Sequence, residues 1–565
     1  MAYEKLSQVM RNLDEGYLYE LLGDLKKTLV EWSFDGKSLA LKQNLVDVIV
    51  AINGLDLFEK ESFRYNFFLV TNDLELIKKL CSISNVPVNE NDDYCSLSSK
   101  LSKIPFKENP LYNFLIFDYL MVPDYIFKDI SDNTNSEFIK IDTKGMNELY
   151  DYQYMIKQQA INDLSNEEKG LYKILIHMPT GTGKTKTTMH IISHYINYIS
   201  KAKGLVVWIA HSDELLKQAY NTFKSVWNFL GQRDLTIYKG WNGYPNSFEN
   251  GILFTSIQAL LSKMKKPVFE YLDKNSTLIV FDEVHKAGAS KYRKCVDALT
   301  SKQYDYTKAF IGLTATPGRT TEISKENEAF SGSFDHIIGI DVEKVISITL
   351  NKNEANNYSG SKEVIPYFQD QKILARLKRK VLDFDLDPSL KASLKDELRK
   401  TREDYSDDLL EKIALNKARN TKIVEELRRL NEDSVPTIVF ACSLQHAQML
   451  SAFLKILNIP NALVYGDMNK YERERAISDF KDPKNPTKII INYEILTTGF
   501  DSTNIRCVFI TRPTKSVILY SQMIGRGLRG PKMGGNEECL LIDVKENLDA
   551  YNENDAFKHF DEYWR

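Results

Sequence analysis

The chain has 565 residues, 43% hydrophobic and 27% charged, a composition that indicates folded globular domains and excludes a largely disordered protein. No apolar run approaches the roughly 18 residues of a membrane span, and no apolar core follows the N-terminus as in a signal peptide. The six cysteines are scattered without a C-x-x-C pair, which indicates reduced thiols in a cytoplasmic protein. The net charge of −3 excludes nucleic-acid binding by bulk positive charge, so such binding needs a local track of contacts.

Residues 1–147 form the first unit that we expect, an N-terminal accessory domain of mixed α/β structure. Helical periodicity runs from Leu18 to Val30 and from Leu39 to Leu57. The short apolar runs Phe67–Val70 and Phe114–Phe117 fit either strands or parts of buried helices. The activity of this unit does not follow from its sequence.

One pattern at the end of this unit suggests chemistry. Asp124, Asp142 and Lys144 flank the strand-like segment Phe138–Ile141 and formally match the paired acids and lysine of a metal-dependent nuclease core. Residues Ser131–Asn135 between them are typical of turns, so a solvated loop is the simpler interpretation.

The most informative stretch combines an apolar run, a glycine loop and a helix. Leu171–Met178 predicts a buried strand, and helical spacing follows the loop. The N–H groups of such a loop and of the helix N-terminus bind phosphate. Lys184 can reach the β- and γ-phosphates, and the Thr185 hydroxyl can ligate Mg²⁺; Met178 stands where the strict pattern has glycine. The expected ATP-binding residues of the loop are Thr180, Gly181, Thr182, Gly183, Lys184 and Thr185.

Polar residues near other apolar runs are weaker candidates. Gln153 lies just upstream of the loop, where a side-chain amide can read an adenine edge as donor and acceptor. Gly204–Ala210 predicts a second buried strand, and a third ends near Phe254. The short polar groups that follow suit phosphate contacts and helix capping equally well. These residues are His211, Ser212, Thr255, Ser256 and Gln258.

The apolar run Leu278–Phe281 delivers two adjacent carboxylates to the end of a predicted strand. Ligands of open α/β sheets bind at this end of the strands. Asp282 can hold Mg²⁺, while Glu283 can orient or deprotonate an attacking water. A further strand, Phe310–Leu313, ends in the small hydroxyl residues Thr314 and Thr316.

Together these stretches resemble the ordered motifs of superfamily 2 helicases. Gln153 resembles the Q-motif, and the glycine loop resembles motif I. Asp282-Glu283-Val284-His285 resembles motif II, and Thr314-Ala315-Thr316 resembles motif III. The DEVH and TATP forms are similar to the DEAD/DEAH-type motors of restriction enzymes and DNA repair helicases.

The resemblance implies an α/β fold with two tandem RecA-like parallel-sheet domains and a helical insert between the lobes. The boundaries that we expect are 1–147 for the accessory domain, 148–345 for the ATP-binding lobe, 346–431 for the charged helical insert, 432–548 for the second lobe and 549–565 for an acidic tail.

The resemblance continues in the C-terminal half. Ser443 and His446 fall where motif IV contacts the nucleic-acid backbone, residues 496–501 are similar to motif V, and residues 520–529 match motif VI. Arginines on the second lobe imply that hydrolysis requires the lobes to close. The resemblance assigns ATP binding to Gly499 and Asp501, nucleic-acid contacts to Ser443, Thr497 and Thr498, catalysis to Gln522, Arg526 and Arg529, and coupling to Thr314 and Thr316.

The expected function is ATP hydrolysis, with ATP and Mg²⁺ as cofactors, coupled to movement on DNA by a helicase or double-stranded DNA translocase. DNA is expected ahead of RNA, in phage defence, restriction or DNA repair, and no membrane partner is expected. One alternative is an ATP-gated assembly module that recruits a partner protein through residues 1–147. An RNA helicase and a nuclease–motor fusion are the others.

Overall fold

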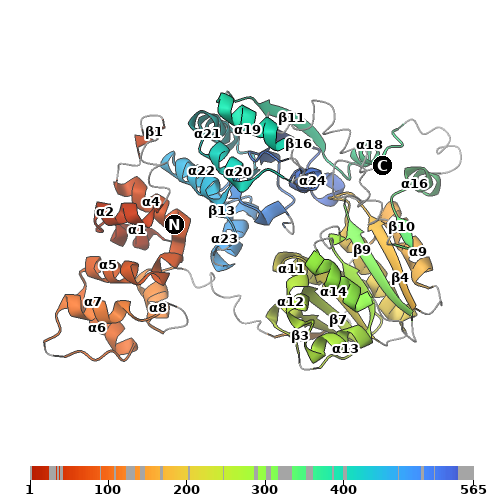
Figure 1. Ribbon diagram of the computed structural model, residues 1–565, viewed down its shortest axis with the longest axis horizontal. Coiled ribbons are helices and arrows are strands. Elements are labelled where there is room, and N and C mark those ends of the chain that lie inside the picture. The colour runs from red at the N-terminus through yellow and green to blue at the C-terminus, as the bar shows by residue number, and fades with distance from the viewer. Residues whose placement is uncertain are drawn as a thin grey trace.

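The computed structural model (Figure 1) describes residues 3–23, 33–34, 37–38, 42–89, 91–106, 110–122, 134–139, 147–165, 170–200, 204–245, 247–284, 290–300, 307–315, 334–350, 360–384, 387–398, 404–466, 468, 470–497, 500, 502–514 and 516–544. These residues form a helical N-terminal unit and two lobes, each built on a mainly parallel sheet. No helix among them is both long and apolar enough to cross a bilayer.

The N-terminal unit consists of short helices around an apolar core. In α5 the buried residues Phe63, Phe67 and Phe68 follow the helical period. Asp14 and Asp73 begin helices by accepting a hydrogen bond from a backbone N–H three residues on. The elements are α1 (Glu4–Met10), α2 (Glu15–Leu21), α4 (Lys42–Asn53), a 3-10 turn (Gly54–Glu59), α5 (Glu61–Thr71), α6 (Leu74–Ile83), α7 (Tyr94–Ser102), α8 (Pro110–Asn113), a π-helical turn (Phe114–Tyr119) and the ribbon β1 (Ser33–Phe34) and β2 (Lys37–Ser38).

The expectation of a mixed α/β accessory domain is corrected by these elements. Phe67–Val70 lies inside α5, and Phe114–Phe117 lies in the π-helical turn. A run of four apolar residues carries no period of its own, so sequence alone cannot separate a strand from a buried helix. The expected strand around Phe138 exists as β3 (Ser136–Ile139), but it joins the sheet of the first lobe. Asp124, Asp142 and Lys144 lie outside the described residues.

The first lobe is built on a sheet with the strand order β10-β4-β9-β8-β5-β7-β6-β3, in which only β3 runs antiparallel to its neighbour. The central strand β5 is buried along its whole length, as expected for a parallel strand covered on both faces. The strands are β4 (Gly170–His177), β5 (Leu205–Ala210), β6 (Leu235–Lys239), β7 (Gly251–Ser256), β8 (Ser276–Phe281), β9 (Thr307–Thr314) and β10 (His336–Ile338). The helices are α9 (Asp151–Leu164), α10 (Lys184–His194) with a π-helical extension (Tyr195–Ile199), α11 (Asp213–Leu230), α12 (Ile257–Lys263), α13 (Pro267–Asn275), α14 (Ser290–Thr300) and α16 (Val342–Thr349), with a 3-10 turn (Gly240–Asn242).

The second lobe carries a parallel sheet with the order β11-β16-β15-β12-β14-β13. Its strands are β11 (Arg376–Leu382), β12 (Thr437–Phe440), β13 (Asn461–Val464), β14 (Ile489–Asn492), β15 (Cys507–Ile510) and β16 (Glu538–Val544). Its helices are α18 (Val364–Asp370), α19 (Pro388–Leu398), α20 (Asp407–Ala414), α21 (Lys417–Glu432), α22 (Leu444–Ile456), α23 (Lys470–Lys481) and α24 (Val517–Ile524), with 3-10 turns (Ile495–Thr497 and Pro531–Met533).

The segment 346–431, expected as a helical insert, also contributes a strand to the second sheet. β11 pairs with β16 from Arg376 opposite Glu538 to Leu382 opposite Val544. Its lysines are paired with acids, Lys378 with Glu538 at 2.6 Å among them. Such a dense run of charged residues predicts a solvated helix. β11 is instead an edge strand, where charged side chains are also common.

The N-terminal helices pack on the second lobe, although the chain leads from them into the first (Figure 1). α4 lies against α22, and one apolar core extends from the N-terminal helices to β12 and β14. The Leu55 N–H and the Tyr3 hydroxyl both donate to the Glu472 carboxylate of α23, at 2.9 and 2.8 Å. The N-terminal unit and the second lobe therefore form one packed body.

Candidate active site

The glycine loop joins β4 to α10 with the backbone shape that a phosphate site needs. Gly181 and Gly183 have φ angles of 87° and 82°, in the left-handed region where a Cβ would introduce strain. Gly183 is the N-cap of α10, so the unpaired N–H groups of the helix end at the loop. Lys184 and Thr185 are the first two residues of the helix.

Two side chains of α9 hold this loop. The Tyr152 hydroxyl and the Gln153 amide donate to the Thr182 carbonyl, at 2.7 and 2.9 Å. Gln153 is fully buried, and its Oε1 accepts from the Tyr150 N–H at 3.1 Å. Gln153 therefore fixes the loop in this structure, and its contact with adenine stays a prediction.

The predicted carboxylates lie beside the predicted lysine. Lys184 Nζ lies 3.0 Å from Glu283 Oε1 and 3.8 Å from Asp282 Oδ1. Burial lowers the pKa of Lys184, but the two carboxylates raise it by more, so its pKa is raised and the ammonium stays charged. Glu283 has a φ of 53°, a strained value for a residue with a side chain and one that clusters at functional sites.

The strand that carries the loop is tied to the strand that carries Thr314. The backbone carbonyl of the buried Thr314 accepts a hydrogen bond from the Met178 N–H at 3.1 Å. His177 Nε2 lies 3.0 Å from the Ala315 carbonyl, which can only accept, so this nitrogen carries the proton. Burial lowers the pKa of His177 to about 4, which keeps the ring neutral. The sequence did not single out His177, because one histidine at a strand end has no distinctive pattern.

The second lobe closes directly over the glycine loop. A Cβ on Gly525, at the end of α24, would collide with the Thr180 side chain. A Cβ on Gly181 would lie 3.3 Å from a methyl group of Leu374. The Tyr150 hydroxyl donates to the Lys532 carbonyl at 2.7 Å. The loop is therefore covered by segments more than 190 residues further along the chain.

Motif VI is anchored beside this contact. Arg526 donates to the carbonyls of Phe500 and Thr497, at 2.6 and 3.0 Å, and its charge lowers the pKa of Lys184 across the interface. The Arg529 backbone forms a bridge to Leu374. Gln522 is only 8% exposed, and no described residue is a hydrogen-bond partner of its Nε2. Because an unpaired buried donor is costly, this amide fits a site whose acceptor comes from a ligand such as a phosphate.

The residues predicted to contact nucleic acid divide into two groups. His211 and Ser212 line a cavity of about 470 Å³ between the lobes, opposite Tyr465 and Arg473. Ser212, Ser256 and Ser443 each accept a hydrogen bond from the N–H three residues on, as helix caps. Capping uses the hydroxyl oxygen and leaves its hydrogen available to a phosphate. Gln258 is exposed on α12.

Other candidates among the described residues have buried side chains. Thr255 is fully buried with its hydroxyl bonded to that of Tyr244. His446 is also fully buried, with Nδ1 accepting from the Cys442 N–H and Nε2 bonded to Asn420. The contacts of Thr255 and His446 with the nucleic-acid backbone stay predictions, although burial of these side chains, which is not visible in a local motif, does not favour them. Thr497 is 9% exposed and bonded to the Glu494 carbonyl. His285, Thr316, Thr498, Gly499 and Asp501 lie outside the described residues.

Comparison with known families matches both lobes. The family described as "Type III restriction enzyme, res subunit" matches residues 146–319, and "Helicase conserved C-terminal domain" matches residues 418–530. The chain belongs to superfamily 2 of the helicases. Enzymes of this superfamily hydrolyse ATP.

Several proteins are similar to this helicase over most of its length. IRC3 of Saccharomyces cerevisiae, whose name describes an ATP-dependent helicase, is 27% identical over 70% of this chain and 51% of its own. The EcoAI type I restriction endonuclease subunit of Escherichia coli is 24% identical over 73% of this chain and 47% of its own. The DNA 3'-5' translocase XPB2 of Sulfurisphaera tokodaii is 24% identical over 77% of this chain and 90% of its own. The helicase thus spans about half the length of the first two relatives.

Proposed function

We propose that this helicase is a DNA-stimulated ATPase that uses closure of its two lobes to move on DNA. The contact of Gly525 with Thr180 of the glycine loop, together with the charge of the adjacent Arg526 acting on Lys184, carries the proposal. It brings a fixed cation of one lobe to the phosphate loop of the other, which is the arrangement that couples hydrolysis to lobe movement. The relatives named for restriction and DNA translocation support a role in restriction, phage defence or DNA repair.

Hydrolysis begins with an exchange of partners at Lys184. In this structure its ammonium pairs with Glu283 at 3.0 Å. Phosphates on the glycine loop would attract the ammonium away from this carboxylate, because they carry more negative charge. Glu283 is then available to accept a proton from the attacking water. The ion pair therefore holds the catalytic carboxylate inactive until the loop is filled.

Thr185 and Asp282 are the residues that fit Mg²⁺. The ion takes oxygen ligands and is commonly held by one or two protein groups together with substrate phosphates, which matches one hydroxyl and one carboxylate. When bound, Mg²⁺ neutralises the charge that develops on the phosphoryl oxygens. Arg526 and Arg529 supply charge from the second lobe, an effect typically worth roughly 10³–10⁵ in rate.

The expected mode of binding and the preference for DNA rest on separate grounds. Ser212 and Ser443 carry short polar groups that suit phosphates rather than base edges, so binding should not depend strongly on sequence. DNA rather than RNA is proposed because relatives are named for restriction and DNA translocation. With a net charge of −3, affinity should rest on few ionic contacts and fall only modestly with salt.

Phosphate release measured with matched single-stranded DNA, duplex DNA and RNA tests the proposal. We expect low activity alone and stimulation by DNA, with the duplex at least as effective as the single strand. Stimulation by RNA alone would instead make the protein an RNA helicase. No stimulation by any nucleic acid would favour an ATP-gated assembly module whose activator is a partner of the N-terminal unit.

A further inference from the structure

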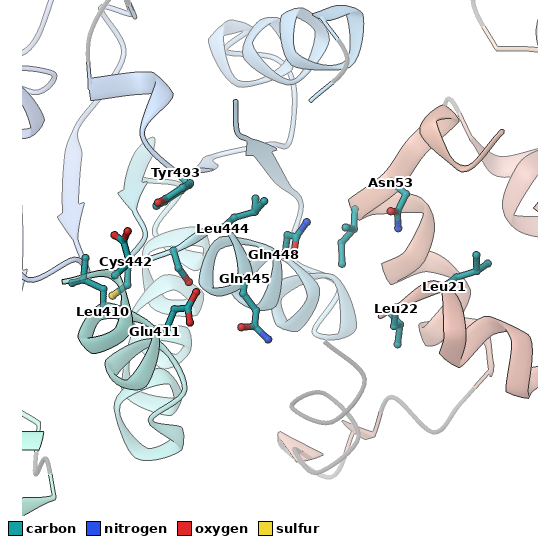
Figure 2. A pocket seen from close by; sticks show the side chains of 13 residues that line it. Leu21, Leu22, Asn53, Leu410, Glu411, Cys442, Leu444, Gln445, Gln448 and Tyr493 are labelled. Atoms are coloured by element: carbon teal, nitrogen blue, oxygen red, sulfur yellow. The ribbon is translucent and has the colours of Figure 1, made fainter. Parts of the chain in front are cut away.

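A second cavity, of about 500 Å³, lies between the N-terminal helices and the second lobe (Figure 2). The first turn of α22, with Gln445 and Gln448, lies between side chains of α20 and those of the N-terminal helices (Figure 2). The cavity shares Leu444 and Tyr493 with the cavity between the lobes. The two spaces are therefore neighbours, and a strand leaving the first would reach the second.

Several polar side chains of this cavity keep hydrogen-bonding groups that no described residue engages. Among the described residues, no hydrogen bond involves the amide of Gln445 or of Gln448, and no ion pair involves Asp407 or Glu411 of α20. Asn53, at the end of α4, donates to the Ile49 carbonyl at 3.0 Å and keeps its own oxygen as an acceptor. The described lining includes no lysine, arginine or histidine. Such a site offers acceptors and amides but no positive charge.

The remaining walls are apolar and aromatic. Leu21, Leu22 and Ile52 come from the N-terminal helices and are buried. Tyr493 follows β14, and burial raises its pKa to about 12, so the phenol stays neutral. A tyrosine ring with neighbouring apolar side chains can bind the flat face of a base.

We propose that this cavity receives a nucleobase of the strand that passes between the lobes, so that the N-terminal unit extends the nucleic-acid site. The inference rests on the proposed function. Asp407 and Glu411 repel phosphates, so the backbone must stay at the rim while a neutral base enters. Carboxylates and amide oxygens accept hydrogen bonds from the exocyclic amines of adenine and cytosine, which thymine lacks. The cavity therefore favours adenine or cytosine over thymine at one position of the strand.

Binding of fluorescent single strands, measured by anisotropy, tests this inference. The strands are an oligothymidine and a series in which one adenine is moved along it. We expect one position at which adenine improves affinity about fivefold or more, the lower end of the discrimination expected from a good base contact. Gln448→Ala should abolish this preference while binding of oligothymidine persists.

Asn53→Ala and Asn66→Ala form a matched pair. Each asparagine donates to the carbonyl four residues earlier, Ile49 or Ser62, but only Asn53 lines the cavity. We expect the positional preference to be lost in Asn53→Ala and kept in Asn66→Ala, with similar melting temperatures.

Three negative results are distinguishable. DNA-stimulated hydrolysis with equal affinity for every strand would overturn the base pocket and leave the acidic cavity to a basic segment of a partner protein. A positional preference that survives both Asn53→Ala and Gln448→Ala would place the base elsewhere and overturn it too. Absence of any DNA binding or stimulation would contradict the motor function itself.

Discussion

At the scale of single residues, the ion pair of Lys184 with Glu283 describes the resting state of the site, and its separation is the proposed first step of hydrolysis. Two carboxylates and one ammonium are nearly buried together, so the ammonium and the carboxylates stabilise one another's charges. In the proposed mechanism the same groups act separately, since the ammonium binds phosphates and Glu283 accepts a proton from water.

Lys184→Ala should reduce ATP turnover by about 10²-fold or more, a loss comparable to removal of one group that stabilises developing charge. Lys186→Ala is the matched control, because its ammonium lies in the same helix but donates to the Glu148 carbonyl at 2.5 Å. Steady-state phosphate release at saturating ATP gives the comparison. Equal turnover in both variants would remove the glycine loop from the mechanism.

At the scale of secondary-structure elements, α11 and α23 connect the lobes beside the cavity that His211 and Ser212 line. Arg473 pairs with Glu214 and Glu474 pairs with Lys217, each at 2.9 Å. The neighbouring residues Arg473 and Glu474 of α23 thus carry opposite charges, and each pairs with a residue of the other sign on α11. Exposed ion pairs of this kind contribute only about 0–1 kcal/mol each, so they bias lobe closure without locking it.

Lys217→Glu should reduce DNA-stimulated hydrolysis severalfold, because the new carboxylate repels Glu474 and disfavours closure. The charge-swapped double variant Lys217→Glu with Glu474→Lys should recover most of the activity. Hydrolysis should be measured across a range of salt concentrations, since screening weakens exposed pairs. A double variant no better than the single one would show that this ion pair does not influence closure.

At the scale of the whole molecule, the N-terminal unit is bound to the second lobe through Glu472. This carboxylate is 9% exposed and accepts from both the Leu55 N–H and the Tyr3 hydroxyl. Burial raises its pKa, which the two hydrogen bonds and Arg475 only partly offset. Arg475 lies over the Tyr3 ring at 5.2 Å. The nearby Arg473 pairs with the first lobe, so residues of one helix, α23, contact both the N-terminal unit and the first lobe.

The docking of the N-terminal unit should weaken as the pH rises. A carboxyl whose pKa is raised in the folded state contributes stability below its ordinary pKa, near 4.3, and loses it as the pH rises through the folded value. Glu472→Gln should remove this dependence, because its amide oxygen can accept the same hydrogen bonds without charge. The measurement is the protection of the α4 amides against hydrogen exchange at pH 5 and pH 8, each taken relative to the intrinsic exchange rate at that pH.

Glu474→Gln is the control for this experiment, because Glu474 lies in the same helix but pairs with Lys217 of the first lobe. It should leave the pH dependence of exchange in α4 unchanged. Equal protection of α4 in the parent protein at both pH values would show that Glu472 does not control docking.

The local parts of this helicase can be predicted from runs of consecutive residues. The order of strand, glycine loop and helix around Lys184 is a property of about thirty consecutive residues, so periodicity and glycine placement are sufficient to predict it. Asp282 and Glu283 follow a buried strand, and parallel strands end at one edge of the sheet. Their approach to Lys184, across 99 residues, follows from that rule.

Which surfaces cover one another depends on contacts between segments that are distant in the chain. Apolar periodicity shows that α4 has a buried face but not that α22 covers it, and the charged segment of β11 gives no sign of its pairing with β16. The burial of Thr255 and His446, and the position of Gly525 on Thr180, likewise depend on segments distant in the chain. Apolar burial is non-directional, so a local apolar pattern shows only that a face must be covered. Which segment covers it depends on the shape and charge of segments distant in the chain.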